Sequence, residues 1–239
     1  MGSLQVHQIL VDVFTARADA VGSVLDRLCA ASVEALPVDG AGMALMTAAG
    51  HGGTLAATDG PAVAMENLQS TLGEGPCLDA FRDGRPVLES DLASTGTSRW
   101  PAFVAGAQEA GITAVFAFPL QIGAIRLGVL DFYRDVIGPL TAAELALALD
   151  FAAAATTLVL DLQNKTAPGE LHPHLADAAA GRREIHQATG MITVQAAVGL
   201  TEALLLLRAR AYADDRSLLD LAKDVVARKV TFRPEDDPS

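Results

Sequence analysis

The segment GRREIHQATGMITVQAAVGLTEALLLLRARAYADDRSLLDLAKDVVARK, which runs from Gly181 to Lys229, shows three successive amphipathic patterns. In each pattern apolar residues recur three or four positions apart, which places their side chains on one face of a helix. The recurring residues are Ile185, Ala188, Ile192 and Ala196; Ala203, Leu204, Leu207 and Ala211; and Leu218, Leu221, Ala222 and Val225. The sequence therefore predicts three short helices that pack into a compact all-α module.

Local signals predict where two of these helices begin. Thr201, which follows Gly199, is the expected N-cap of the second helix. The third helix is expected to begin at Ser217, because Ser217 and Asp220 have the spacing of a capping box.

The charge of this module differs from that of the whole chain. Nine basic and seven acidic residues lie between positions 176 and 233, whereas the chain carries a formal charge of −12. Basic side chains bind polyanions by displacing counterions from phosphates. A solvated helical surface explains the same charges, and charge alone favours that simpler interpretation.

Three groups of residues in this segment match a known family: Ile185-His-Gln-Ala188-Thr-Gly190-Met-Ile192; Glu202-Ala203 with Leu207-Arg208 and Ala211; and Leu218, Leu219, Ala222 and Val225-Val226. With this spacing the segment resembles the ANTAR family of RNA-binding antiterminator modules. Thr189 stands where the family commonly has Lys, so one phosphate contact of the family is missing in this chain.

The resemblance implies an RNA-binding face on the module. The expected contacts on the first helix are Arg182, Arg183, His186, Gln187, Thr189 and Gly190, and the expected phosphate contacts are Arg208, Arg210, Arg216 and Lys223. Glycine in an exposed helix costs about 1 kcal/mol relative to alanine, so Gly190 indicates close approach by another backbone, either RNA or a neighbouring helix. Proteins read single-stranded loop bases of RNA, which favours stem-loop targets.

Length and composition limit the class of protein. The 239 residues suffice for one large or two small domains, and 51% of them are apolar. Cys29 and Cys77 lack metal-site spacing, which favours a reducing compartment. No signal peptide is predicted, because the N-terminus has no basic region before its apolar residues. The apolar run 145–160 contains Asp150 and is short for a membrane span, so we expect a cytoplasmic protein without membrane contact.

The first two thirds of the chain alternate between helical and strand patterns. Helices are predicted at 4–36, 65–72, 101–110 and 141–164, and strands at 41–48, 54–58, 86–89, 112–120 and 127–133. Thr141 and Glu144 have capping-box spacing at the start of the last helix. This order predicts an α+β domain with an antiparallel sheet flanked by helices.

A second family resemblance covers roughly residues 5–163. It is carried by Gly73-Glu-Gly-Pro-Cys-Leu-Asp-Ala80, Gly84-Arg-Pro-Val87, Asp91-Leu92, Arg99-Trp100-Pro101 with Phe103, Phe118-Pro-Leu120 and Leu127-Gly-Val-Leu-Asp-Phe-Tyr133. As a set these motifs resemble the GAF domain found ahead of ANTAR modules in actinobacterial proteins. The resemblance implies a small-ligand sensor or a dimerisation module. Residues 164–176 are then the expected linker, 177–233 the three-helix module and 234–239 an acidic tail.

The candidate ligand-binding residues of the first domain are Cys77, Trp100, Phe118, Asp131 and Tyr133. Cys77, just before an expected short helix, is either a redox-sensing thiol or a small buried apolar residue. Trp100 and Phe118 line a pocket or pack in the core. Asp131 and Tyr133 share one side of a strand, because residues two apart point the same way. His172 and His174 are too constrained by Pro173 for a metal site, and no cofactor is predicted.

The sequence contains no phosphate-binding loop, nucleophile elbow or metalloprotease motif, so an enzyme is not expected. The leading interpretation is a homodimeric, signal-responsive regulator that binds RNA stem-loops and controls transcription termination. Two alternatives are a dimerisation or protein-interaction module without RNA binding, and a sensor whose helical tail contacts duplex DNA.

Overall fold

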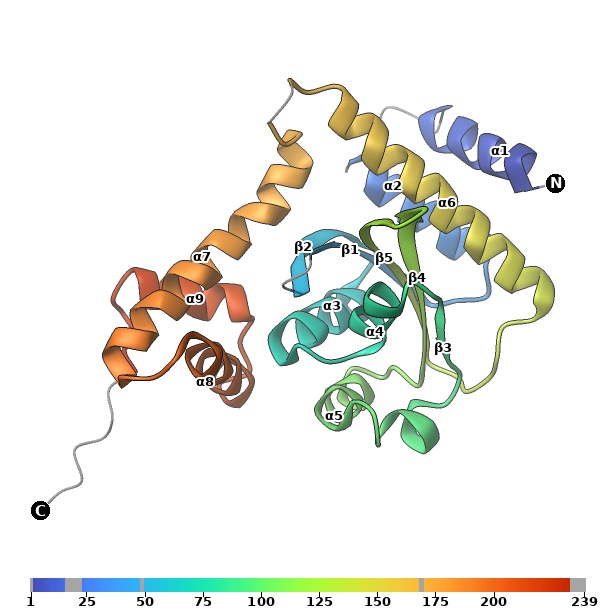
Figure 1. Cartoon of the computed structure of the whole chain (residues 1–239). Helices are drawn as coiled ribbons and strands as arrows, with labels where there is room; N and C mark the ends of the chain where they lie inside the picture. Colours follow the sequence, from blue (N-terminus) through green and yellow to red (C-terminus); the bar gives the residue numbers. More distant parts are fainter. Residues whose placement is uncertain (1, 16–22, 48–49, 168–169, 233–239) are drawn as a thin grey trace, which may run out of the picture.

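The computed structural model describes residues 2–15, 23–47, 50–167 and 170–232. A five-stranded antiparallel sheet forms its centre, with strand order β2-β1-β5-β4-β3 (Figure 1). The strands are β1 (Gly40–Thr47), β2 (Gly50–Ala57), β3 (Val87–Glu89), β4 (Ala114–Ile122) and β5 (Ile125–Arg134). This sheet and its helices confirm the predicted α+β fold of the N-terminal part.

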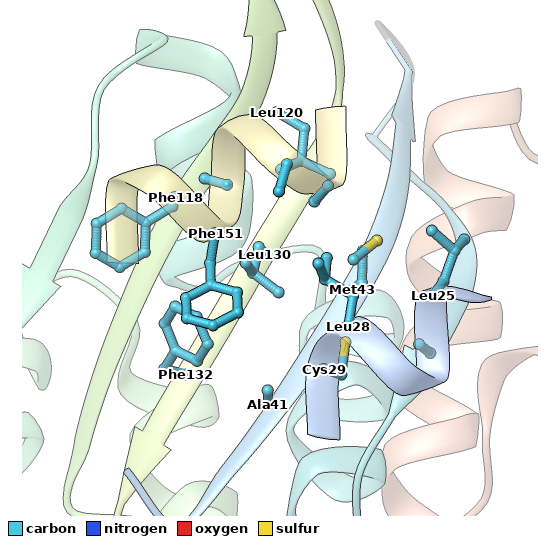
Figure 2. Close-up of a cluster of buried hydrophobic side chains, with 14 of the residues drawn as sticks. Leu25, Leu28, Cys29, Ala41, Met43, Phe118, Leu120, Leu130, Phe132 and Phe151 are labelled. Atoms are coloured by element: carbon cyan, nitrogen blue, oxygen red, sulfur yellow. The ribbon is translucent and has the colours of Figure 1, made fainter. Parts of the chain in front are cut away.

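Helices α2 (Val24–Ala35) and α6 (Ala142–Asn164) cover one face of the sheet, and α1 (Gly2–Thr15) packs on α6 (Figure 1). Figure 2 shows the core between them, in which Phe118, Phe132 and Phe151 gather beside the residues of α2. The rings of Phe118 and Phe132 meet edge to face, with centroids 5.7 Å apart. Alternate residues of β4 and β5 supply this core because a strand directs every second side chain to one face.

The predicted helix 4–36 is two helices in the structure. A capping box between Ser23 and Asp26 begins α2, with bonds of 2.7 Å and 3.2 Å between side chain and backbone. Residues 16–22 lie outside the described residues. The capping box at Thr141 and Glu144 forms as predicted and begins α6. By length and composition α6 is apolar enough to cross a membrane, but half of its apolar window is buried inside the protein.

The opposite face of the sheet carries α3 (Gly60–Leu72), α4 (Pro76–Asp83) and α5 (Pro101–Glu109), together with a π-helical turn, η1 (Leu92–Gly96). Helix α3 begins earlier than predicted, because the Asp59 side chain accepts a bond from the amide of Ala62 and Pro61 occupies the first turn. Cys77 lies inside α4 rather than before it.

Three helices follow the sheet domain: α7 (Pro173–Ala196), α8 (Leu200–Ala213) and α9 (Leu218–Val226). Their facing residues form a separate core, which contains Ala188, Ile192, Leu207 and Leu221. Helix α7 starts at Pro173, so the last residues of the predicted linker are helical. The N-cap of α8 is Gly199, and Thr201 lies inside the helix. Ser217 caps α9 as predicted and accepts a bond from the amide of Asp220 at 3.1 Å.

The three-helix module rests against the edge and one face of the sheet domain (Figure 1). Helix α7 lies along the edge strand β2, where the backbone of Ala178 approaches Gly53 too closely for any side chain at that position. Helices α8 and α9 contact α3. Covering an edge strand with a helix hides backbone groups that would otherwise pair with another strand.

Candidate ligand cavity and helical surface

A cavity of about 860 Å³ opens on the face of the sheet that carries α4. Its walls come from α4, the β1–β2 hairpin, the turn between α3 and α4, the residues before α5, and β5 with the turn before it. They include Met46, Gly73, Glu74, Leu78, Asp79, Phe81, Arg82, Arg99, Trp100 and Arg126. This mixture of apolar surface and a few polar groups is typical of a small-molecule site.

Asp79 organises the polar wall of the cavity. Its two carboxylate oxygens pair with Arg82 and Arg99, each at 2.8 Å. The indole Nε1–H of Trp100 donates to Asp79 at 3.2 Å, and the Arg99 guanidinium lies 4.1 Å from the centre of the Trp100 ring. One carboxylate therefore fixes the positions of two arginines and the tryptophan.

Glu74 ties the α3–α4 turn to α5. Its Oε1 accepts bonds from the amides of Ala102 and Phe103 at 2.9 Å and 3.0 Å. These amides lie in the first turn of α5, where backbone N–H groups lack partners within the helix. The turn and the start of α5 therefore form one connected wall.

A buried polar chain runs beneath the cavity. It begins at Cys77, whose Sγ lies 3.7 Å from the sulfur of the wall residue Met46. The amide of Cys77 donates to Oε1 of Gln69 at 2.7 Å, and Nε2 of Gln69 donates to Asp131 at 3.2 Å. Gln69 therefore links α4 to the central strand β5.

Glu66 lies beside Asp131 and reaches His51 of β2, with 3.2 Å between His51 Nε2 and Glu66 Oε2. Burial raises the pKa of Glu66 to about 8 and lowers the pKa of His51 to about 4. Burial also raises the pKa of Asp131 well above its usual range, and the neighbouring Glu66 raises it further. At neutral pH Glu66 and His51 are therefore predominantly uncharged, as expected for ionisable groups removed from water.

The interpretation of Cys77 as a redox-sensing thiol is wrong. Cys77 is fully buried, and its burial, followed by the nearby Asp131 and Glu66, raises the thiol pKa well above its usual range. A reactive thiol needs the opposite environment, one that is exposed and positively charged.

The other predicted ligand residues separate into three places. Trp100 lies in the cavity wall with 2% of its surface exposed. Phe118 faces the opposite side of the sheet, in the core of Figure 2, so its assignment to a pocket is wrong. Asp131 and Tyr133 share one side of β5 as predicted, but Asp131 belongs to the buried chain and the Tyr133 hydroxyl donates to Asp59 at 2.9 Å.

On α7, the predicted RNA contacts Arg183, His186 and Gln187 are exposed. Arg182 is half-buried and donates from Nε to His186 at 3.2 Å. The prediction that Thr189 contacts RNA is wrong. Thr189 is 5% exposed, and its hydroxyl donates to the carbonyl of Ile185 at 2.7 Å. A threonine hydroxyl satisfied by the preceding turn of its own helix is not presented to a partner.

Gly190 is half-buried on α7 and faces open space, because no atom lies within 4 Å of the place that a Cβ would occupy. Of the two partners predicted for this glycine, the neighbouring helix is therefore excluded within the described residues.

Three basic residues of α8, α9 and the connection between them pair with acids of the same module. The pairs are Arg210 with Asp214 at 2.7 Å, Arg216 with Asp224 at 2.5 Å, and Lys223 with Asp220 at 3.6 Å. Arg208 instead packs against Gly73 of the sheet domain. Among the described residues, Arg182 and Arg183 of α7 form no ion pair with an acidic side chain.

Sequence reasoning missed Glu74, Asp79 and Arg99 as wall residues, although all three lie in motifs that carry the GAF resemblance. It also missed His51 and Glu66. The available signal was the pair Glu66 and Gln69, two polar residues three positions apart on the inner face of α3. Within the ranges that the structure describes, no three His, Cys, Asp or Glu residues are grouped as metal ligands.

Comparisons with known proteins identify the sheet domain. No curated protein matches the chain. The GAF domain of an Acinetobacter phosphoenolpyruvate-protein phosphotransferase is similar in fold, with a TM-score of 0.51 and 11% identity over 70% of this chain and 96% of that one. A domain of a sensor histidine kinase protein from Sinorhizobium meliloti 1021 has 20% identity and a TM-score of 0.48, over 62% of this chain and 97% of that one.

The GAF domain family is also matched directly. Its family model covers residues 18–160, which is more than half of the chain, and this protein therefore belongs to the GAF domain family.

Proposed function

We propose that this protein is a cytoplasmic, non-enzymatic regulator whose GAF domain binds a small molecule and whose C-terminal helices bind structured RNA to control transcription termination. GAF domains are sensor or regulatory domains that commonly bind small molecules and dimerise. The observation that carries the proposal is the shared wall: Gly73 lines the cavity and also contacts Arg208 of the helical module.

The proposed RNA face is the exposed side of α7. Arg183, His186 and Gln187 recur at helical spacing and are open to solvent. Guanidinium and imidazole groups stack on bases splayed out of RNA loops, and the amide of glutamine reads their edges. The resemblance of this segment to ANTAR modules supports a stem-loop target.

The direct test is a gel-shift titration of the full chain with stem-loop RNA beside duplex DNA of matched sequence. We expect binding to the RNA with a steep dependence on salt. Arg183→Ala should weaken binding and reduce the log–log salt slope by roughly 0.7 for each lost single-strand phosphate contact. Arg85→Ala, which removes an exposed arginine from the GAF domain, is the matched control and should leave both quantities unchanged.

Preference for the duplex would favour the DNA-binding alternative. Failure of stem-loop RNA to bind at low salt, with the chain folded and dimeric, would refute the RNA part of the proposal. An unchanged slope in Arg183→Ala would remove Arg183 from the face.

A second candidate function is a protein-interaction or dimerisation module. It is favoured by three apolar side chains at the surface of the helices: Val194, Leu200 and Leu205 are 83%, 67% and 57% exposed. Leu205→Gln should then reduce self-association in sedimentation velocity while leaving the helix content unchanged. If Leu205→Gln leaves the self-association unchanged, the exposed apolar side chains no longer support this second function.

A further inference from the structure

The end of α3 is shared by the cavity and the helical module. Gly73 and Glu74 line the cavity on one side. On the other side, the Arg208 guanidinium covers Gly73, and the amide of Leu218 donates to the Thr71 hydroxyl at 3.3 Å. The segment 71–74 therefore contacts the helical module through Thr71 and Gly73 and lines the cavity through Gly73 and Glu74.

This interface is weakly held. Among the described residues, a single hydrogen bond joins α3 to α8 and α9, from the amide of Leu218 to Thr71, and no ion pair does. Two further cavities of about 520 and 610 Å³ lie between the module and the sheet domain. Interfaces that are small and imperfectly packed permit relative motion of domains.

Burial of the Arg208 guanidinium opposes the docked arrangement of the module on α3. Its Nε is buried without a hydrogen-bond partner among the described residues, and burial lowers the pKa of its guanidinium. Burying an unpaired donor of a charged group opposes docking, because that donor loses its water. Separation of the module would return Arg208 to solvent, so the docked state requires the remaining contacts with α3.

The α3–α4 turn is also firmly connected to the cavity. Glu74 accepts bonds from the first amides of α5, and the amide of Cys77 donates to Gln69 in the last turn of α3. A molecule that fills the cavity and moves Glu74 must therefore move Gly73, which lies directly beneath Arg208.

We propose that filling the GAF cavity and docking of the helical module are coupled through residues 71–74, so that an occupied cavity releases α8 and α9 from α3. The consequence for RNA rests on the proposed function: release frees Arg208 to contact phosphate. Coupling of this kind is reciprocal, so a loosened module must also change the affinity of the cavity for its ligand.

The coupling is testable without knowing the natural ligand. Leu78 lines the cavity and is half-buried, whereas Cys29 and Cys77 are fully buried. The variant Leu78→Cys thus offers one accessible thiol, and alkylation with N-ethylmaleimide places a bulky group in the cavity of the full chain. The unlabelled variant is the reference for the labelled one.

The readout is hydrogen exchange at the amide of Leu218. This amide is the first of α9 and its partner is the Thr71 hydroxyl across the interface, so its protection reports docking. We expect alkylation at position 78 to raise its exchange rate roughly fivefold or more, the usual scale of coupling between two sites. Arg208→Ala is expected to alter the same rate, because it changes the docked contact directly.

The control is Leu88→Cys, alkylated in the same way on the exposed edge strand β3, which should leave the Leu218 amide unchanged. An unchanged rate after alkylation at position 78, with a changed rate in Arg208→Ala, would overturn the coupling. An unchanged rate in Arg208→Ala would overturn the assigned contact. Neither measurement involves RNA, so both outcomes are independent of RNA binding.

Discussion

The guanidinium of Arg208 lies against Gly73, the residue that ends α3 in a left-handed conformation with φ of 69°. A Cβ on Gly73 would overlap this guanidinium. The two residues are 135 positions apart in the chain, and their contact joins the GAF domain to the helical module.

The contact between Gly73 and Arg208 predicts a non-additive pair of substitutions. Gly73→Ala should destabilise the protein in denaturant titrations through both the left-handed backbone, which costs about 1–2 kcal/mol, and the overlap with Arg208. In an Arg208→Ala background the overlap disappears, and the two substitutions should differ from additivity by about 0.5 kcal/mol or more. Gly111→Ala is the control, because Gly111 has φ of 78° and open space around it. Additive free energies for the pair would exclude the contact.

The buried carboxyl group of Glu66 predicts a pH dependence of stability. Its pKa is raised from 4.5 to about 8, so between these values the folded chain holds a proton that the unfolded chain has released. Stability therefore falls as pH rises through this window, by up to about 1.4 kcal/mol per pH unit. Glu66→Gln should flatten this slope in denaturation measured across the window. Glu34→Gln, on the exposed side of α2, is the matched control. Equal slopes in wild type and Glu66→Gln would contradict the assignment.

Trp100 is the single tryptophan of the chain and reports the cavity wall. Asp79→Ala removes the acceptor of its indole N–H and the partner of two arginines, so we expect red-shifted emission and a loss of about 1–2 kcal/mol in stability. Asp83→Ala is the control, since Asp83 is exposed and pairs with Arg82 alone among the described residues. Emission unchanged by Asp79→Ala would show that this carboxylate does not hold the wall together.

Gly190 predicts a gain in stability on substitution. Because open space surrounds it on α7, Gly190→Ala should raise the free energy of unfolding by about 1 kcal/mol through helix propensity. Gly181→Ala on the same helix should gain less, because its Cβ would lie 2.9 Å from the side chain of Leu219. If Gly190 also contacts RNA, the alanine variant will be more stable and bind RNA more weakly. Equal gains at both glycines would argue against this packing.

The two thiols predict a simple chemical result. Cys29 and Cys77 are fully buried, and burial raises the pKa of both. Ellman's reagent should therefore leave the native protein unmodified and react with two thiols after denaturation. Rapid reaction of either thiol in the native protein would reopen the redox interpretation.

The sequence by itself determined the elements whose signals are local. Hydrophobic spacing identified the three C-terminal helices, and the capping residues Thr141 and Ser217 identified two helix starts, because these signals depend on residues within one or two turns. The helix boundary at Thr201 was wrong because Gly199, two residues earlier, adopts the extended conformation of an N-cap.

Only the tertiary structure decided which residues meet across the chain. It separated Trp100 from Phe118 onto opposite faces of the sheet, buried Thr189, joined Glu66 to His51 and set Arg208 against Gly73. Such contacts depend on how helices and strands dock. Docking is set by the sum of many weak packing interactions between distant segments, and this sum cannot be predicted from any short stretch of sequence.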